Sequence, residues 1–125
     1  MEAEERRVWA IRGAITVDSD SVEAVDSAVK EMLDAIYMEN GIVEDNVVFT
    51  LFSQTEDIKS RNAAAAARKN GYSTHTPLFC VQEASVENML PLTIRVLIEI
   101  EKMMDGKPVM VYLKGAKALR PDIRR

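Results

Sequence analysis

Two arginines in apolar segments and one glutamate near the end of an apolar run are the residues of this sequence best suited to chemistry. Arg12 stands within the segment 10–14 (AIRGA), Arg95 stands within 94–96 (IRV), and Glu83 comes soon after the run LFCV. A guanidinium among apolar residues costs free energy unless it is paired, and it can hold a carboxylate through two parallel hydrogen bonds. Functional side chains are often placed where strands end and loops begin. A ligand that carries carboxylates is the chemistry that these residues would suit.

Each of these residues also has an ordinary structural interpretation. Arg12 could reach solvent or pair with a carboxylate of the chain. Arg95 could belong to a surface ladder of opposite charges, because strand alternation places Glu99 and Glu101 on its side. Glu83 could be a hydrated loop residue. Spacing alone leaves both interpretations open.

Three further side chains have weaker claims. Tyr112 lies on a strand that we expect beside Arg95, so phenol and guanidinium could converge on one sheet face, although a core or exposed tyrosine is the ordinary outcome. Cys80 has no visible basic partner and is expected to pack as a small hydrophobic residue, not to act as a nucleophile. His75 lies between two threonines and is expected at the surface.

Length and charge limit the classes of protein to consider. With 125 residues, of which 47% are hydrophobic, the chain predicts one domain over 1–125, with a frayed start at 1–7. The net charge of −4 and the pI of about 5.1 argue against a nucleic-acid partner, which would need a basic patch. An anionic ligand must therefore be held by a local cluster of arginines.

Apolar runs and cysteine usage narrow the classes further. No apolar stretch approaches the roughly 20 residues that cross a bilayer, and the acidic N-terminal residues do not resemble a signal peptide. We therefore expect a cytoplasmic protein without a membrane partner. One cysteine and one histidine permit neither an intrachain disulfide nor a Cys/His metal cluster. The sequence predicts no metal site and no cofactor.

The clearest element is a helix after the first strand. The segment 8–17 is rich in β-branched and aromatic residues and predicts that strand, in which Gly13 leaves room for another backbone or a ligand. Asp20, with Glu23 three residues later, marks the helix start, and Asn40-Gly41 marks its end. Its apolar stripe consists of Val22, Val25, Val29, Met32, Leu33 and Ile36.

The remaining elements alternate in type. Strands are predicted over 47–52, 77–81, 92–101 and 109–114, and a short alanine-rich helix over 62–70, stopped by Gly71. The turn signal DGKP at 105–108 predicts that the last two strands form a hairpin. The order β-α-β-α-β-β-β indicates an α+β fold, a mixed sheet with two main helices on one face. Identical neighbours could cover the other face, so we expect a homo-oligomer.

Together, these segments resemble one enzyme family. From residue 8 to 122 the chain resembles the AroH-class chorismate mutases, the trimeric α/β kind. The segments that carry the resemblance are 11–17 (IRGAITV), 80–83 (CVQE), 94–96 (IRV), 111–113 (VYL) and 119–122 (LRPD). The resemblance implies a homotrimer with a pseudo-α/β-barrel core and active sites between subunits. It also implies the cofactor-free rearrangement of chorismate to prephenate in phenylalanine and tyrosine biosynthesis.

The resemblance assigns roles residue by residue. Arg95 would contact the ether oxygen of chorismate and Glu83 its ring hydroxyl, as the catalytic pair. Arg12 and Tyr112 would bind the side-chain carboxylate. The other binding residues would be Phe79, Cys80, Val81 and Gln82 in the pocket wall, and Arg68 and Arg120 near its mouth. The segment from Asn62 to Arg68 would come from the neighbouring subunit.

One segment departs from the family pattern. Where many relatives have Phe-Pro-Ala-Lys, this chain has Asn-Ala-Ala-Ala at 62–65, so an aromatic wall and a lysine are missing.

The alternative function is a non-catalytic trimer that binds a small anionic metabolite as a regulatory module. Glu83 separates the two hypotheses, because a carboxylate beside an anion helps this rearrangement but not simple anion binding.

Overall fold

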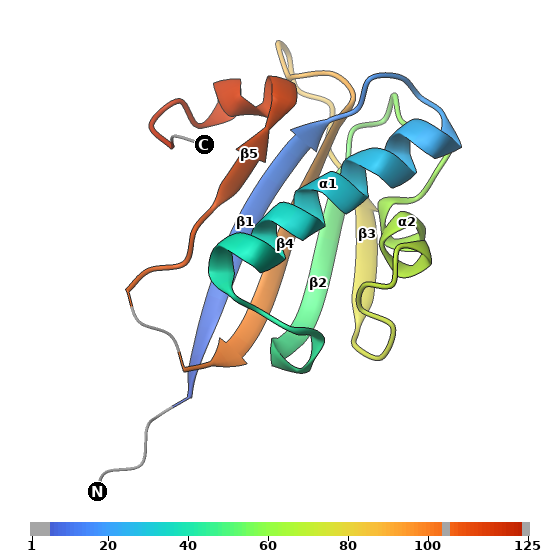
Figure 1. Ribbon diagram of the computed structural model, residues 1–125. Helices are drawn as coiled ribbons and strands as arrows, with labels where there is room; N and C mark the ends of the chain where they lie inside the picture. The colour runs from blue at the N-terminus through green and yellow to red at the C-terminus, as the bar shows by residue number, and fades with distance from the viewer. Residues whose placement is uncertain (1–5, 104–105, 124–125) are drawn as a thin grey trace, which may run out of the picture.

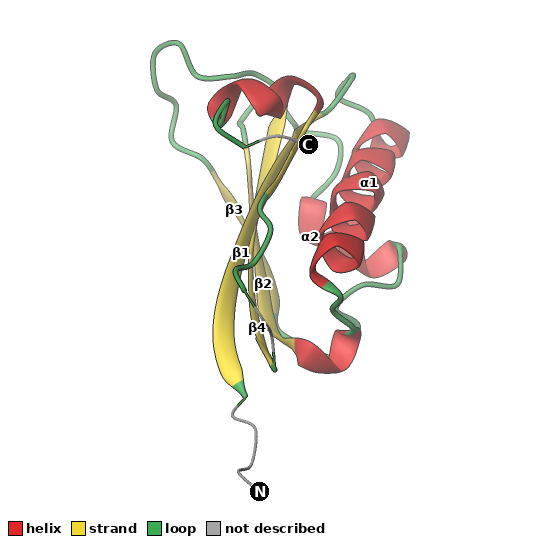
Figure 2. Ribbon diagram, turned by 60° about the vertical axis from the view of Figure 1, so that its left-hand side comes forward, coloured by secondary structure: helices red, strands yellow, loops and turns green. Residues whose placement is uncertain are grey.

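Five strands form one mixed sheet, and both α-helices lie on the same face of it (Figures 1 and 2). The computed structural model describes residues 6–103 and 106–123. In chain order the elements are β1 (Arg7–Thr16), α1 (Val22–Asn40), η1 (Glu44–Asn46), β2 (Val47–Gln54), α2 (Ala63–Lys69), β3 (Leu78–Gln82), β4 (Thr93–Lys102), β5 (Val111–Leu113) and η2 (Lys114–Leu119), where η marks a 3-10 helix. The predicted α+β fold with two helices on one face is confirmed.

Helix α1 begins one residue later than its capping signal predicts. Ser21, not Asp20, is the N-cap, and its hydroxyl accepts a hydrogen bond from the backbone N–H of Ala24 at 3.1 Å. The Asp20 carboxylate accepts instead from the backbone N–H groups of Lys59 and Ser60, at 3.0 and 2.9 Å. Aspartate and serine are both good N-caps. Because the Asp20 carboxylate binds the loop before α2, Ser21 caps the helix. Gly41 ends the helix in the left-handed conformation, as predicted.

The strand order is β3-β2-β4-β1-β5, so the predicted hairpin between the last two strands is wrong. Both edges of β4 are occupied, by β1 and β2, and β5 pairs in parallel with β1 instead. The ladder between β1 and β4 extends over ten residue pairs, whereas β5 offers only three residues. Asp105 of the turn signal lies outside the described residues.

The main core fills the space between the sheet and the helices. As the alternation predicts, Ile94, Val96, Ile98 and Ile100 of β4 are all buried on that side. Gly13 lets two elements approach closely: an added Cβ would lie 2.8 Å from Ile36 Cδ1 and 3.0 Å from the carbonyl oxygen of Val111. The missing side chain therefore allows α1 and β5 to pack against β1.

The second face of the sheet carries neither α-helix (Figure 2). At the β1 and β5 end, the C-terminal segment covers part of this face, where Ala14, Tyr112 and Ala116 form a small buried cluster. No helix in the described part of the chain is long and apolar enough to cross a membrane. Of the predicted frayed start, 1–5 fall outside the described residues, but Arg7 begins β1 and pairs with Lys102, so its inclusion was wrong.

Helix α2 is short and bordered by two asparagines. The Asn62 side chain caps it by accepting from the backbone N–H groups of Ala64 and Ala65, at 2.8 and 3.2 Å. Asn70 is the C-cap, and Gly71 follows with a positive φ of 88°. The short helix predicted over 62–70 is confirmed, with Asn62 and Asn70 as its caps and Gly71 directly after it.

Candidate active site

Strand register gathers the charged residues on the open face of the sheet. Arg95 of β4 is directly opposite Ala14 of β1 and Ser53 of β2, and Ser53 is opposite Val81 of β3. Two residues further along β4, Leu97 is opposite Arg12 of β1. Because side chains two residues apart share a face of a strand, Arg12 and Arg95 are diagonal neighbours on the face without helices.

The side chains on this face line a polar pocket of about 260 Å³. It is lined by Arg12, Leu51, Ser53, Val81, Glu83, Arg95, Val96 and Leu97. Four of the residues singled out from the sequence therefore meet in one chain: Arg12, Val81, Glu83 and Arg95. The other four lining residues, Leu51, Ser53, Val96 and Leu97, were missed. Alternation along β2 and β4 could have placed Leu51, Ser53 and Leu97 on the same face, whereas Val96 is buried in the main core.

Glu83 and Arg95 form an ion pair in this pocket. Arg95 Nη1 lies 3.2 Å from Glu83 Oε1, with side chains 36% and 13% exposed. The backbone N–H of Glu83 donates to the carbonyl oxygen of Gln54 at 2.9 Å, which extends the β2–β3 pairing and fixes the start of the loop. Arg95 therefore pairs with Glu83 and not with a ladder of Glu99 and Glu101.

The pair leaves one buried donor and one buried acceptor unused. Arg95 Nε and Glu83 Oε2 are inaccessible to solvent and have no hydrogen-bond partner within residues 6–103 and 106–123. Buried polar groups in proteins are nearly always hydrogen-bonded, and leaving one unpaired costs about 1–3 kcal/mol. The ion pair that lines the pocket therefore keeps unused hydrogen-bonding capacity, and a polar ligand with both an acceptor and a donor would meet it once the two side chains turn toward that ligand.

Tyr112 shares the open face but lies outside the pocket. It is opposite Ala14 on β1, which in turn is opposite Arg95, so one strand separates the phenol from the guanidinium. Its side chain is buried, 3% exposed, in the cluster under the C-terminal segment. Arg120 covers the ring, with its guanidinium carbon 5.9 Å from the ring centroid, and is held by Asp122 at 2.8 and 3.0 Å.

Three other predicted binding residues, Cys80 and Gln82 of the wall and Arg68 of the mouth, lie outside the pocket of one chain. Cys80 faces the helices, and its thiol donates to Gln54 Oε1 at 3.3 Å, while burial raises the pKa of that thiol. This agrees with a packed cysteine and not with a wall of the one-chain pocket. Gln82 is exposed and outside the pocket lining, and Arg68 is exposed on α2, which lies on the helix side of the sheet (Figure 2).

Phe79 belongs to a second, apolar hollow beside the pocket. This hollow of about 480 Å³ is lined by Val48, Phe49, Thr50, Leu51, Pro77, Leu78 and Phe79, and it shares Leu51 with the polar pocket. The Phe79 side chain is 66% exposed. A large apolar side chain beside charged ones on an open sheet is typical of a surface that another molecule covers.

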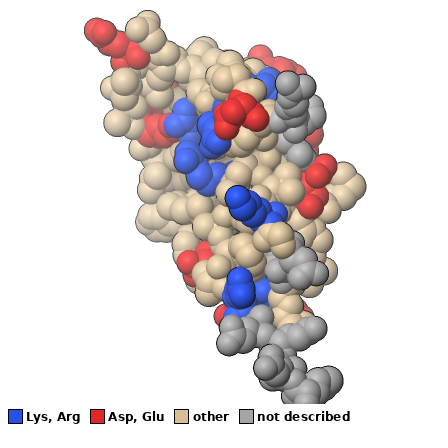
Figure 3. All heavy atoms as spheres, turned by 90° about the vertical axis from the view of Figure 1, so that its left-hand side faces the viewer, with Lys and Arg blue, Asp and Glu red and all other residues tan. Residues whose placement is uncertain are grey.

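The charge distribution favours anions locally, although the whole chain is acidic. Figure 3, seen from the side of β5 and the C-terminal segment, shows a group of Lys and Arg side chains with acidic ones around it. Within the described ranges no group of three or more His, Cys, Asp or Glu could hold a metal ion. Fold and pocket thus define a class: an α+β protein with a candidate site for a small anion on its open sheet face.

Comparisons with known proteins give this class its family. The model of the family "Chorismate mutase type I" matches residues 8–123. A chorismate mutase AroH from Thermus thermophilus is 39% identical over 118 residues, covering 93% of this chain and 96% of the relative. The chorismate mutase AroH of Bacillus subtilis is 33% identical over 117 residues, covering 93% and 92%. A solved chorismate mutase structure from Clostridium thermocellum superposes with a TM-score of 0.80 at 33% identity, covering 88% of this chain and 98% of that one.

The chain therefore belongs to the chorismate mutase type I family, and it is an isomerase of that family. The resemblance identified from short segments is confirmed over almost the whole chain. The comparisons give no support to the non-catalytic binder.

Proposed function

We propose that this chain converts chorismate to prephenate and that Arg95 and Glu83 are the residues that lower its barrier. The observation that carries the proposal is the unused pair of buried groups, Arg95 Nε and Glu83 Oε2, in a pocket that also contains Arg12. One substrate can use both groups, because chorismate has an ether oxygen that accepts hydrogen bonds and a ring hydroxyl that donates one.

The reaction needs no external reagent. In this intramolecular Claisen rearrangement the ether C–O bond breaks while a C–C bond forms, and no atom or electron is gained or lost. A protein can accelerate it by holding the substrate in its reactive shape and by placing charges where the transition state becomes polar. Arg95 would donate to the ether oxygen as negative charge builds there. Glu83 would accept from the ring hydroxyl and balance positive charge on the ring.

The other residues would bind and enclose the substrate. Arg12 and Tyr112 would hold the side-chain carboxylate. Arg120, whose guanidinium lies over the Tyr112 ring, would contribute at the mouth, and Phe79 and Val81 on the open face of β3 would form the wall. Only part of this set lines the pocket of one chain, which supports a site completed by a second copy.

We propose a homotrimer with active sites between subunits. The polar pocket opens beside the apolar hollow that contains Phe79, on a sheet face that lacks α-helices. A neighbouring chain packed on this face would bury the hollow and bring the segment from Asn62 to Arg68 over the pocket. Location in the cytoplasm remains a prediction from the sequence, which cell fractionation checks.

The test is turnover of chorismate by the purified chain, followed by its ultraviolet absorbance in the presence of a chelator. We expect Arg95→Ala to lower kcat by at least ~10²-fold, the usual loss for one transition-state donor. Glu83→Gln, which keeps the shape of the side chain, is expected to lower kcat with less effect on KM.

Glu99→Gln is the matched control, because Glu99 shares the face of β4 with Arg95 but lies outside the pocket. It should retain wild-type turnover. Full turnover in Arg95→Ala would refute the assignment of the site. Binding of chorismate by the wild-type chain without any conversion would instead favour the anion-binding module.

A further inference from the structure

Helix α2 buries no large side chain that could fix its position. It has seven residues, and its buried side chains are those of Ala63, Ala66 and Ala67, all fully inaccessible. Isolated helices shorter than ~12–15 residues are marginal in water, so such a helix depends on its contacts. Methyl groups allow close approach to α1 but interlock little. The placement of α2 along and around its axis must therefore come from polar contacts.

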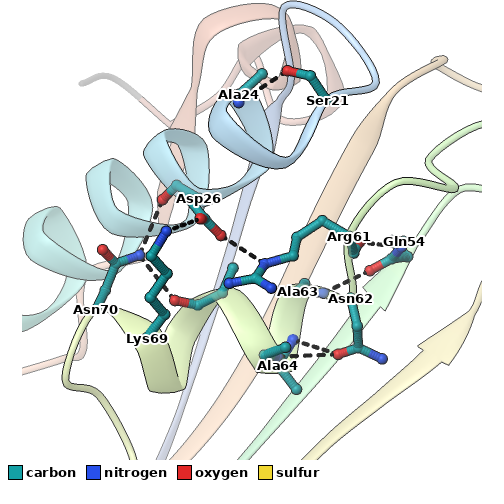
Figure 4. A network of polar contacts seen from close by, with 12 residues as sticks. Ser21, Ala24, Asp26, Gln54, Arg61, Asn62, Ala63, Ala64, Lys69 and Asn70 are labelled. Carbon is teal, nitrogen blue, oxygen red and sulfur yellow. Dashed lines mark hydrogen bonds and ion pairs between the residues drawn. The ribbon is translucent and has the colours of Figure 1, made fainter.

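One carboxylate on α1 holds both ends of α2. Asp26 Oδ1 accepts from Nε of Arg61, just before the helix, at 2.8 Å, and Oδ2 accepts from Nζ of Lys69, its last residue, at 2.9 Å (Figure 4). The Asn70 side chain adds a bond of 3.0 Å to the backbone carbonyl of Asp26. Contacts at both ends prevent sliding, which a single contact could not do.

Asp26 is suited to this task because it is buried and rigidly placed. Only 9% of the residue is exposed, and it lies in the second turn of α1 among buried neighbours such as Val25 and Val29. A buried carboxylate is tolerated when it is paired and hydrogen-bonded. Charge-assisted hydrogen bonds from the Arg61 guanidinium and the Lys69 ammonium hold that carboxylate in one orientation.

A second contact ties α2 to the strand that carries the pocket. Gln54, at the end of β2, accepts from the backbone N–H of Ala63 at 2.9 Å and donates to the carbonyl oxygen of Arg61 at 3.1 Å. Its neighbour Ser53 lines the polar pocket. Between Asp26 and Gln54, the position of α2 is fixed relative to both α1 and the sheet.

We propose that Asp26 is a positioning residue for substrate binding, because it sets where α2 presents Arg68. Arg68 is exposed on α2, directly before Lys69. The proposal rests on the proposed function, in which the α2 segment of one chain completes the pocket of its neighbour. Without the ion pairs from Asp26 to Arg61 and Lys69, α2 would shift while Arg95 and Glu83 stay in place.

The experiment measures kcat and KM for chorismate in Asp26→Asn, Arg68→Ala and the double variant. We expect Asp26→Asn to raise KM by at least about fivefold with kcat within about twofold, since binding and not the chemical step is affected. The double variant should have the KM of Arg68→Ala alone, because residues that act through one another are not additive. Lys30→Met, which breaks the 2.6 Å ion pair with Asp34 on the same helix, is the control and should be unchanged.

An unchanged KM in Asp26→Asn would overturn the proposal. So would a double variant whose fold increase in KM equals the product of the fold increases in the two single variants. If Asp26→Asn does not fold, Lys69→Met decides, because it removes one of the two contacts and leaves Arg61 paired. It should raise KM in the same direction, and a wild-type KM would count against Asp26. Arg95→Ala, measured in parallel, shows whether the proposed function itself has failed.

Discussion

Two arginines on one sheet face have different surroundings, and this difference predicts different roles. Arg95 is half-buried and paired with Glu83, whereas Arg12 is exposed on β1 at the other end of the pocket lining. A guanidinium beside a buried carboxylate is held in place before the substrate arrives. An exposed guanidinium such as that of Arg12 becomes ordered mainly when the ligand binds.

Arg12→Ala should therefore act on binding more than on the chemical step. We expect KM for chorismate to rise by about tenfold or more with a smaller change in kcat, since the lost contact holds a carboxylate in both ground and transition state. Steady-state kinetics measure both constants. Arg7→Ala is the matched control, because Arg7 lies on the same strand but outside the pocket and should behave like wild type. A fall in kcat with KM unchanged would assign Arg12 to the chemical step.

The sequence predicted on which face of the sheet each arginine lies, but it did not predict the ion-pair partner of Arg95. Alternation along β1 and β4 correctly placed Arg12 and Arg95 away from the buried isoleucines. It could not choose Glu83 over Glu99 as the partner of Arg95, because that choice depends on the pairing of β2 with β3 and β4. The orientation of Cys80 toward the helices follows from the same pairing.

At the scale of elements, the position of β5 shows what local patterns leave open. Its three residues alternate as predicted, but the segment before it is held by a side chain on α1. Asn40 accepts from the N–H of Val109 at 2.7 Å and donates to its carbonyl oxygen at 3.0 Å. The edge of β1 and the end of α1 thus compete successfully with a hairpin on β4, whose edges are occupied. Contacts between residues 69 positions apart leave no trace in a local pattern.

The contact between α1 and α2 predicts how stability depends on pH. Burial alone would raise the pKa of the Asp26 carboxyl, but hydrogen bonds from Lys69 and Arg61 outweigh it and hold the pKa below its usual value of 3.8. A lowered pKa in the folded state means that the ionised carboxylate stabilises the fold above the unfolded-state value. That contribution is lost as the pH falls through the folded-state pKa.

Urea denaturation of the wild type and of Asp26→Asn at several pH values checks this prediction. The difference in free energy of unfolding should be constant from pH 7 to about 5 and shrink below about 4, where the wild-type carboxyl takes up a proton. A difference that grows toward pH 2 would mean that the folded-state pKa is raised and that the ion pairs do not outweigh burial.

At the scale of the whole molecule, the open sheet face and the positions of Arg95 and Arg68 belong together. The pocket and the apolar hollow lie on the face without α-helices, whereas Arg68 is on a helix packed against the opposite face. One chain cannot easily bring both into one site. A ring of identical chains can, because each helix side then borders the next chain's open face.

Mixed assemblies test this arrangement directly. Arg95→Ala impairs the pocket, and Arg68→Ala impairs the helix that would complete a neighbour's pocket. When the two variants are unfolded together and refolded in equal amounts, about a quarter of the intersubunit sites should combine an intact pocket with an intact helix, because the two halves come from independently chosen chains. Activity at low chorismate should then exceed that of a mixture of separately refolded variants and approach about a quarter of the wild-type value. If both residues acted within one chain, no intact site could form by mixing, and the refolded mixture would have only the mean activity of the two variants.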